Sequence, residues 1–241
     1  SASDKSIALF FSTFILPDGA ELYLYNEDYT VVRGAYTNLN MRDDMGFTIG
    51  DFPGNYVIAE YYEPANPKFE GSLIINGISE AYIDILGTKS KSTDVNGYIG
   101  VNCEEGKEWQ DQKHAVIKYS FSSGSYSYLC SGALINNTKN NGVPYFLTAN
   151  HCISSASVAP SVTAYFNYEN PACVDTYSYT PQTISGATLI TTGSESDYTL
   201  LLFDTTLVKR IPVSYKPYFA GWDISGNIAQ KTVGIHHPHG Y

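Results

Sequence analysis

The stretch that decides the fold is a pair of apolar runs bracketed by two cysteines: Cys-Ser-Gly-Ala-Leu-Ile at 130–135 and Tyr-Phe-Leu-Thr-Ala-Asn-His-Cys at 145–152. A polar, Asn-rich segment separates them, which is typical of two antiparallel strands joined by a turn. The second run ends in His151, immediately before Cys152. A histidine that follows a strand lies at the rim of a rigid frame, where an imidazole can act as a general base. From these residues alone, a satisfied core histidine beside a structural cystine stays an open alternative.

The composition favours strands over helices. The 241 residues are 43% hydrophobic and 16% charged, with 21 Tyr and 11 Phe. No window keeps the i, i+3, i+4 apolar spacing of an amphipathic helix beyond a turn or two. Aromatic and hydroxyl residues interleaved with Gly and Asn are typical of strands and turns. We therefore predict an all-β globular protein that is large enough to bury a core.

The charge of the chain argues against a nucleic-acid partner. The net charge of −10 lacks the basic footprint that phosphate binding requires. Residues 1–96 carry 6 Lys and Arg against 14 Asp and Glu, whereas residues 97–241 carry 8 against 10. This difference predicts two units with different surfaces. The acidic pairs at 27–28 and 43–44 lie in no loop with a recognisable period of calcium ligands, so a solvated face is the favoured interpretation.

The apolar runs and turn signals predict two domains and a linker. Residues 1–87 are predicted to form a small β-sandwich or jelly roll, with the role of an accessory or propeptide-like domain. The polar segment 88–100 is the predicted linker. Residues 101–241 contain enough strands to close a small barrel. The predicted strands are 7–16, 21–25, 30–36, 55–62, 71–82, 115–121, 130–135, 145–152, 161–168, 188–190, 198–203 and 230–236.

The cysteines predict an oxidising compartment. All four lie between positions 103 and 173, and their even number suggests two disulfides in a secreted, periplasmic or cell-surface protein. No two cysteines form a C-x-x-C pair, so metal ligation is disfavoured, and we predict no metal and no cofactor. A bond between Cys130 and Cys152 would stabilise the fold by about 3 kcal/mol.

The sequence contains no run of 18 apolar residues, so we predict no membrane span. Residues 1–5 resemble a processed end rather than a signal peptide.

The residues around His151 resemble the trypsin/chymotrypsin-fold serine peptidases, in which Thr-Ala-x-His-Cys surrounds the catalytic histidine. The longer match, over roughly 97–241, is similar to the lysyl endopeptidase-like branch found in bacteria. The first unit resembles, more loosely, the β-rich N-terminal domain carried ahead of such peptidases in some secreted bacterial proteins. The residues that carry the match are 101–106 (VNCEEG), 134–138 (LINNT), 168–173 (YENPAC), 196–201 (SDYTLL), 220–223 (AGWD) and 234–238 (GIHHP).

The resemblance implies a secreted serine endopeptidase that acts on peptide or protein substrates by acyl transfer. The second unit would be the first β-barrel of a chymotrypsin-like fold. His151 would be the general base, and Asp197 would be the carboxylate that orients its imidazole and stabilises the imidazolium. Taken alone, Asp197 stands immediately before an apolar run, at the entrance of a predicted strand, where a turn residue or a cap is the favoured interpretation.

The resemblance also implies the cysteine pairing. Cys130 would pair with Cys152, and Cys103 with Cys173. The second bond closes 70 residues and would contribute about 4 kcal/mol in the loop-entropy model. A further cysteine of the family pattern falls at Gly97 in this chain, so that cross-link is absent.

The nucleophile is the main departure from the family. Members carry the serine in a Gly-x-Ser-Gly turn well downstream of the His-His-Pro segment, together with the oxyanion hole and the specificity pocket. Ser131, Ser194, Ser196 and Ser225 do not match that position. The expectation is that this chain is the N-terminal half of such a peptidase, a fragment rather than a naturally shortened relative, and inactive alone. The resemblance suggests cleavage after lysine, and the pocket residues that would decide this preference are expected outside the chain.

Three alternatives remain open at this stage. A non-catalytic binding module would use Tyr-rich β-surfaces to hold glycan or protein, and then His151 and Asp197 would point to different faces. In the peptidase interpretation their side chains lie within hydrogen-bond reach, at roughly 2.6–3.2 Å. If the first unit is an inhibitory pro-region, its residues should cover the edge that bears His151. The histidines at 236, 237 and 239 are expected to be structural rather than zinc ligands, since Pro238 interrupts their pattern.

Overall fold

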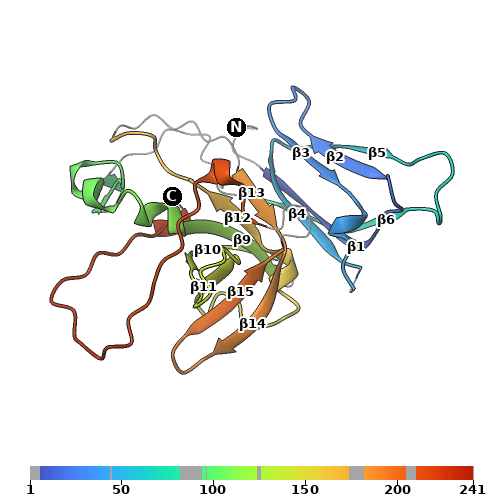
Figure 1. Ribbon diagram of the computed structural model, residues 1–241. Coiled ribbons are helices and arrows are strands. Elements are labelled where there is room, and N and C mark those ends of the chain that lie inside the picture. Colours follow the sequence, from blue (N-terminus) through green and yellow to red (C-terminus); the bar gives the residue numbers. More distant parts are fainter. Residues whose placement is uncertain are drawn as a thin grey trace.

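The computed structural model describes residues 6–43, 45–81, 94–95, 97–123, 126–173, 182–204 and 210–240. Strands dominate these ranges, and the helical segments among them are short 3₁₀ turns. The strands form two groups, coloured blue to cyan and green to orange in Figure 1. The all-β class predicted from the sequence is therefore confirmed, and each group has its own hydrophobic core.

The first group is a sandwich of two three-stranded antiparallel sheets. One sheet has the order β4-β1-β6 and the other β3-β2-β5. Alternation along β2 explains the packing: Leu22 and Leu24 are buried, whereas Tyr23 between them and Tyr25 after them are only half-buried. Facing residues of β1, β2 and β4 complete the core. The strands are β1 (Ser6–Ile15), β2 (Glu21–Tyr25), β3 (Val32–Tyr36), β4 (Phe47–Pro53), β5 (Ile58–Tyr62) and β6 (Ser72–Glu80).

Strand β4 is absent from the predicted strands. Asp43 and Gly46 before it and Gly50 within it weaken the apolar pattern. The strand forms because Phe47, Ile49 and Phe52 are buried in the core and pair with residues of β1. The 3₁₀ turn η2 (Asn38–Asn40) precedes it.

The second group is one curled seven-stranded sheet, in the order β13-β12-β9-β10-β11-β15-β14. Its two edge strands, β13 and β14, are consecutive in the chain and are separated only by a bend at Gly186. The φ angle of Gly186 is +87°, a backbone conformation that would be strained in a residue with a side chain. Gly186 donates its N–H to Val162 and accepts from Asp204, so the bend ties both edges together. The strands are β9 (Val116–Ser123), β10 (Tyr126–Ile135), β11 (Tyr145–Thr148), β12 (Thr163–Phe166), β13 (Gln182–Ser185), β14 (Ala187–Gly193) and β15 (Tyr198–Phe203).

This curled sheet, called the barrel below, surrounds an aromatic core. Phe146 is fully buried; its ring lies 5.3 Å from that of Tyr119 and 4.7 Å from that of Phe203. Ile117 and Leu201 fill the same interior. The short elements around it are β7 (Asp94–Val95), β8 (Tyr98–Ile99), η3 (Glu104–Trp109), η4 (Gln112–Ala115), η5 (Ala159–Ser161), η6 (Val213–Tyr215) and η7 (Pro238–Gly240).

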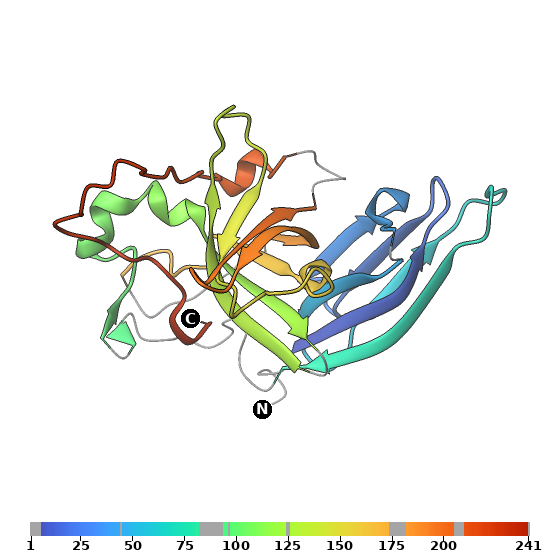
Figure 2. The same cartoon turned by 90° about the horizontal axis from the view of Figure 1, so that it is seen from below.

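The two groups of strands are in contact. Arg42 from the first lies 4.0 Å from the Asp204 carboxylate of the second, with both side chains largely buried. At the other end of the contact, Ser79 of β6 and Ser127 of β10 share a hydrogen bond of 2.9 Å, where the cyan and green strands meet in Figure 2. Most of the predicted linker, residues 88–93 and 96, lies outside the described residues, so the domain limits stay a prediction.

The strand predicted at 230–236 is wrong. Residues 221–235 leave the barrel as a long irregular loop, drawn in dark red in Figures 1 and 2. A strand needs a partner edge for its backbone, and in the described part of the chain this segment pairs with none. Its alternating apolar residues are consequently exposed, including Ile228 at 87%. The nearest pairing is a parallel bridge between Ala220 and Ile135.

Candidate active site

His151 stands on a tight turn immediately after β11. The N–H groups of Cys152 and Ile153 both donate to the carbonyl of Ala149 at 3.2 Å, which closes the turn. Cys152 is joined to Cys130 of the neighbouring strand β10, with Cα atoms 6.7 Å apart. The turn is therefore held on one side by a disulfide and on the other by its own hydrogen bonds, while the His151 side chain is 72% exposed.

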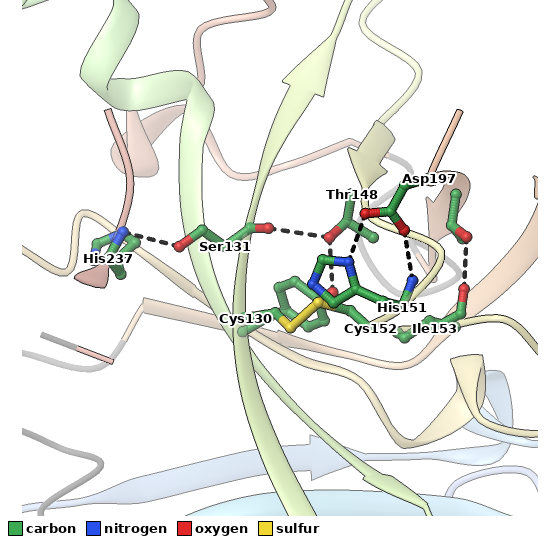
Figure 3. The surroundings of a disulfide bond; sticks show 10 residues. Cys130, Ser131, Thr148, His151, Cys152, Ile153, Asp197 and His237 are labelled. Carbon is green, nitrogen blue, oxygen red and sulfur yellow. Dashed lines mark hydrogen bonds and ion pairs between the residues drawn. A yellow bond between two sulfur atoms is a disulfide. The ribbon is translucent and has the colours of Figure 1, made fainter. Parts of the chain in front are cut away.

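Asp197 reaches His151 because of the pairing between β11 and β15. Thr148 pairs with Thr199, so the end of β11 meets the start of β15. Asp197 lies in the turn before β15 with φ at +48°, a left-handed conformation that Asp tolerates better than most residues. Its Oδ1 accepts the backbone N–H of His151 at 2.8 Å, and its Oδ2 lies 2.6 Å from Nδ1 of the ring (Figure 3).

The contact fixes the chemical state that the imidazole can adopt. An ionised carboxylate only accepts hydrogen bonds, so Nδ1 must carry the proton that it shares with Asp197. In the neutral ring, Nε2 then keeps its lone pair and can take a proton from a neighbouring hydroxyl. The separation lies within the range expected of an oriented general base. This geometry favours the peptidase interpretation over the binding-module alternative, which required the two side chains to face apart.

The same contacts shift the ionisation of Asp197. Its pKa is lowered, first because the backbone N–H of His151 donates to the carboxylate and then because the imidazole does. Both interactions favour the charged form and outweigh the opposing effect of burial. The carboxylate is thus ionised throughout the neutral range, where a base partnered by it would operate.

We expect the Asp197 carboxyl in the native chain to titrate below the ordinary value of about 3.9. Since the folded-state pKa is the lower one, the stabilisation is present above that ordinary value and is lost as pH falls through the folded-state pKa. A ¹³C NMR titration of the carboxyl carbon measures this. In His151→Ala the backbone donor remains, so the pKa should stay partly lowered. A native pKa at or above 3.9 would show that these contacts do not persist in solution.

The second predicted cysteine pair also lies at bonding distance. Cys103 and Cys173 have Cα atoms 4.6 Å apart and are joined by a disulfide. The bond fastens the segment before η3 to the loop after β12. Lys113 reinforces the same junction, because its ammonium contacts Glu169 at 2.9 Å with both side chains largely buried.

The candidate serines do not approach the base. The Oγ of Ser131 accepts the backbone N–H of His237 at 2.9 Å, on a side away from the imidazole (Figure 3). Ser225 lies in the exposed loop and donates to Asp223. Ser194 contributes a backbone carbonyl to the turn that carries Asp197. Among the described residues, no serine hydroxyl is hydrogen-bonded to His151.

The histidines near the end of the sequence pack against aromatic rings. His236 meets Tyr98 edge-on at 5.1 Å, and His237 meets Tyr168 edge-on at 5.8 Å. The His239 side chain lies outside the described residues. In the part of the chain that the structure covers, no group of three or more His, Cys, Asp or Glu residues is gathered as a metal site would need.

The edge that bears His151 is open in the described part of the chain, where the His151 side chain is 72% exposed. The described contacts of the first unit with the barrel lie around β12, β13, η5 and the ends of β6 and β10. His151 itself has only Asp197 as a hydrogen-bond partner among the described residues. This arrangement counts against the idea that the first unit acts as a pro-region covering the base.

The sequence interpretation missed a set of buried hydroxyl groups behind the turn. Thr199, fully buried inside the apolar run of β15, donates to the carbonyl of Ile153 at 2.6 Å. Thr148 donates to the carbonyl of Ser131 at 3.0 Å. A threonine inside an otherwise apolar strand was the available signal, because a buried hydroxyl requires a hydrogen-bond partner.

Comparison with known proteins points to one family. The model of the C-terminal domain of lysyl endopeptidase matches residues 90–241. A lysyl endopeptidase of Pseudomonas aeruginosa is 31% identical over 132 residues, which are 52% of this chain and 28% of that protein. The chain thus spans little more than a quarter of the length of this relative. Among the described residues, no helix is long and apolar enough to cross a membrane.

Proposed function

The chain belongs to the lysyl endopeptidase family, and on that premise we propose that it is part of a secreted serine endopeptidase that hydrolyses peptide bonds by acyl transfer. The single observation that carries the proposal is the double contact of His151 with Asp197, through both the backbone N–H and the ring. A carboxylate that accepts from both the backbone N–H and the ring Nδ1–H fixes one tautomer and one orientation of the imidazole, as a general base requires.

In the proposed reaction, Nε2 of His151 removes the proton of a serine hydroxyl as the serine oxygen attacks the peptide carbonyl. The imidazolium then delivers that proton to the departing amine, and water repeats the sequence on the acyl-enzyme. Asp197 stays ionised and stabilises the imidazolium. We propose that the serine, the oxyanion hole and the specificity pocket belong to a segment outside the 241 residues, so that this chain alone is inactive.

The cellular location, the domain limits and the substrate preference are part of the same proposal. Two disulfides favour an oxidising compartment and hence a secreted, periplasmic or cell-surface enzyme. The relative from Pseudomonas aeruginosa supports a bacterial origin. Residues 101–241 would be the N-terminal barrel of the peptidase, 88–100 a linker and 1–87 an accessory domain. The name of the relative supports cleavage after lysine, since a lysine side chain is what its pocket would need to bind.

The test compares the 241-residue chain with the longer natural protein on one set of peptides. Substrates that differ only at the residue before the scissile bond (lysine, arginine, alanine or phenylalanine) separate lysine specificity from general peptidase activity. The longer protein should cleave the lysine peptide, and a serine-directed fluorophosphonate should block it. Absence of hydrolysis by the longer protein would refute the proposal. Hydrolysis by the 241-residue chain that depends on His151 would refute the placement of the serine.

A further inference from the structure

The turn that carries His151 is tied to the β14–β15 hairpin by a continuous chain of side-chain hydrogen bonds. The amide Nδ2 of Asn150 donates to Oγ1 of Thr192 at 2.8 Å. Thr192 and Thr199 share a hydrogen bond of 2.6 Å between their hydroxyls. The Thr199 hydroxyl in turn donates to the carbonyl of Ile153 at 2.6 Å. The chain begins one residue before His151 and ends two residues after it.

The chemistry of its two ends fixes the direction of this chain. The carbonyl of Ile153 can only accept a hydrogen bond, so the Thr199 hydroxyl must donate its single proton to that carbonyl. The Thr199 oxygen is therefore the acceptor in its 2.6 Å bond with Thr192, whose single proton also has the carbonyl of Tyr198 within reach at 3.1 Å. The Thr192 oxygen accepts in turn from the amide of Asn150. All donors point from Asn150 toward Ile153, an arrangement in which neighbouring hydrogen bonds polarise and strengthen one another.

The hairpin at the other end of this chain is the element that carries Asp197. Thr192 is in β14 and Thr199 in β15, while Asp197 occupies the turn between the two strands. The hydrogen-bond chain and the acid–base contact consequently join the same two pieces of backbone. Thr199 and Ile153 are both fully buried, so water cannot replace the hydroxyl if it is lost.

We propose that Thr199, Thr192 and Asn150 are positioning residues that hold the His151 turn against the hairpin bearing Asp197, with Thr199 as the buried anchor. The inference deepens the proposed function, and its relevance to catalysis rests on it. None of the three residues would touch the substrate. Each would act through the distance and angle between the imidazole and the carboxylate, where errors of about an ångström cost much of the rate.

A second chain of buried hydroxyls provides the matched comparison. The Tyr119 hydroxyl donates to Thr148 at 2.8 Å, and Thr148 donates to the carbonyl of Ser131 at 3.0 Å. This chain has the same chemistry and similar burial, but it joins β9, β11 and β10 and does not reach the β14–β15 hairpin. Loss of its hydroxyl should weaken the barrel without disturbing the contact of His151 with Asp197.

The experiment measures the contact itself in the 241-residue chain, so it needs no hydrolytic activity. ¹⁵N shifts of the His151 ring report the fraction of the tautomer protonated at Nδ1, and a ¹³C titration reports the pKa of Asp197. In Thr199→Val, which keeps the shape of the side chain but lacks the hydroxyl, we expect the Nδ1–H to Nε2–H ratio to fall about fivefold, the worth of one hydrogen bond. The Asp197 pKa should rise toward its ordinary value.

Three further variants make the outcome decisive. Thr199→Ser keeps the hydroxyl and should restore both signals, whereas Thr148→Val should lose stability like Thr199→Val but keep both signals native. If Thr199→Val does not fold, Asn150→Ala at the accessible end of the chain should show the same change at smaller size. Native signals in Thr199→Val, or in Asn150→Ala where that variant takes its place, would overturn the inference, as would an equal change in Thr148→Val. If these signals behave as expected and the longer protein hydrolyses no peptide, the proposed function fails while the positioning stands.

Discussion

Replacing Asp197 with asparagine is expected to lower kcat of the proposed full-length peptidase by about 10⁴-fold. Oδ2 of Asp197 lies 2.6 Å from Nδ1 of His151, and its Oδ1 accepts the backbone N–H at 2.8 Å. The asparagine amide can still accept the backbone N–H of His151 with its single oxygen. It then turns its NH₂ toward Nδ1, which forces the proton of the ring onto Nε2. The nitrogen that should remove the serine proton is already protonated, so the base is lost while the fold stays intact.

The measurement is kcat and KM on a lysine peptide across pH, with circular dichroism as a check on folding. KM should change little, because Asp197 acts on the transition state and not on substrate binding. Asp28→Asn is the matched control: that carboxylate also accepts from a backbone N–H and a side-chain hydroxyl, both of Thr30, and its pKa is lowered by them, but it lies in the first sandwich. A loss of less than about tenfold in Asp197→Asn would contradict the assigned role.

The parts of the site that are local in sequence were predictable. A strand that ends in His151 beside Cys152 places an imidazole at a sheet edge whatever the rest of the chain does. Asp197 was predicted through the resemblance of residues 196–201 to the peptidase family, because a carboxylate before an apolar run is by itself more typical of a turn or a cap. What brings the two together is the register of β11 with β15, and that register follows from which faces of the two strands are apolar.

The parts that depend on distant residues could not be predicted in the same way. Asn150 and Thr192 are 42 residues apart, and Thr199 and Ile153 are 46 apart, so no local pattern marks them as partners. The bend at Gly186 could likewise not be predicted from the local sequence, because it depends on the positions of β13 and β14 in the sheet. Strand β4 was missed and the strand at 230–236 was wrongly predicted for one reason. A segment becomes a strand only where a neighbouring edge is available to pair with it, and the local sequence does not show that edge.

Gly132→Ala is expected to destabilise the barrel by about 3 kcal/mol, the upper part of the usual cost of overpacking. A Cβ at this position would lie 2.4 Å from Cζ of Phe146 and 2.7 Å from the backbone oxygen of Leu147. The ring has no free space to enter, because Phe146 is fully buried and packs against Tyr119 and Phe203. Strands β10 and β11 must therefore move apart. His151 follows β11 directly, so this change of one methyl group also strains the turn that carries the base.

Urea denaturation of the 241-residue chain measures the effect, with Gly221→Ala as the control. At Gly221 an added Cβ would meet no atom within 4 Å, so the free energy of unfolding should change by less than about 0.5 kcal/mol. Adding Phe146→Leu to Gly132→Ala removes the ring atoms that clash but not the clash with the backbone oxygen of Leu147. The double variant should therefore be more stable than the sum of the two single losses, because the residues are in contact. Strict additivity would contradict the packing argument, since it would mean that the methyl group and the ring do not meet.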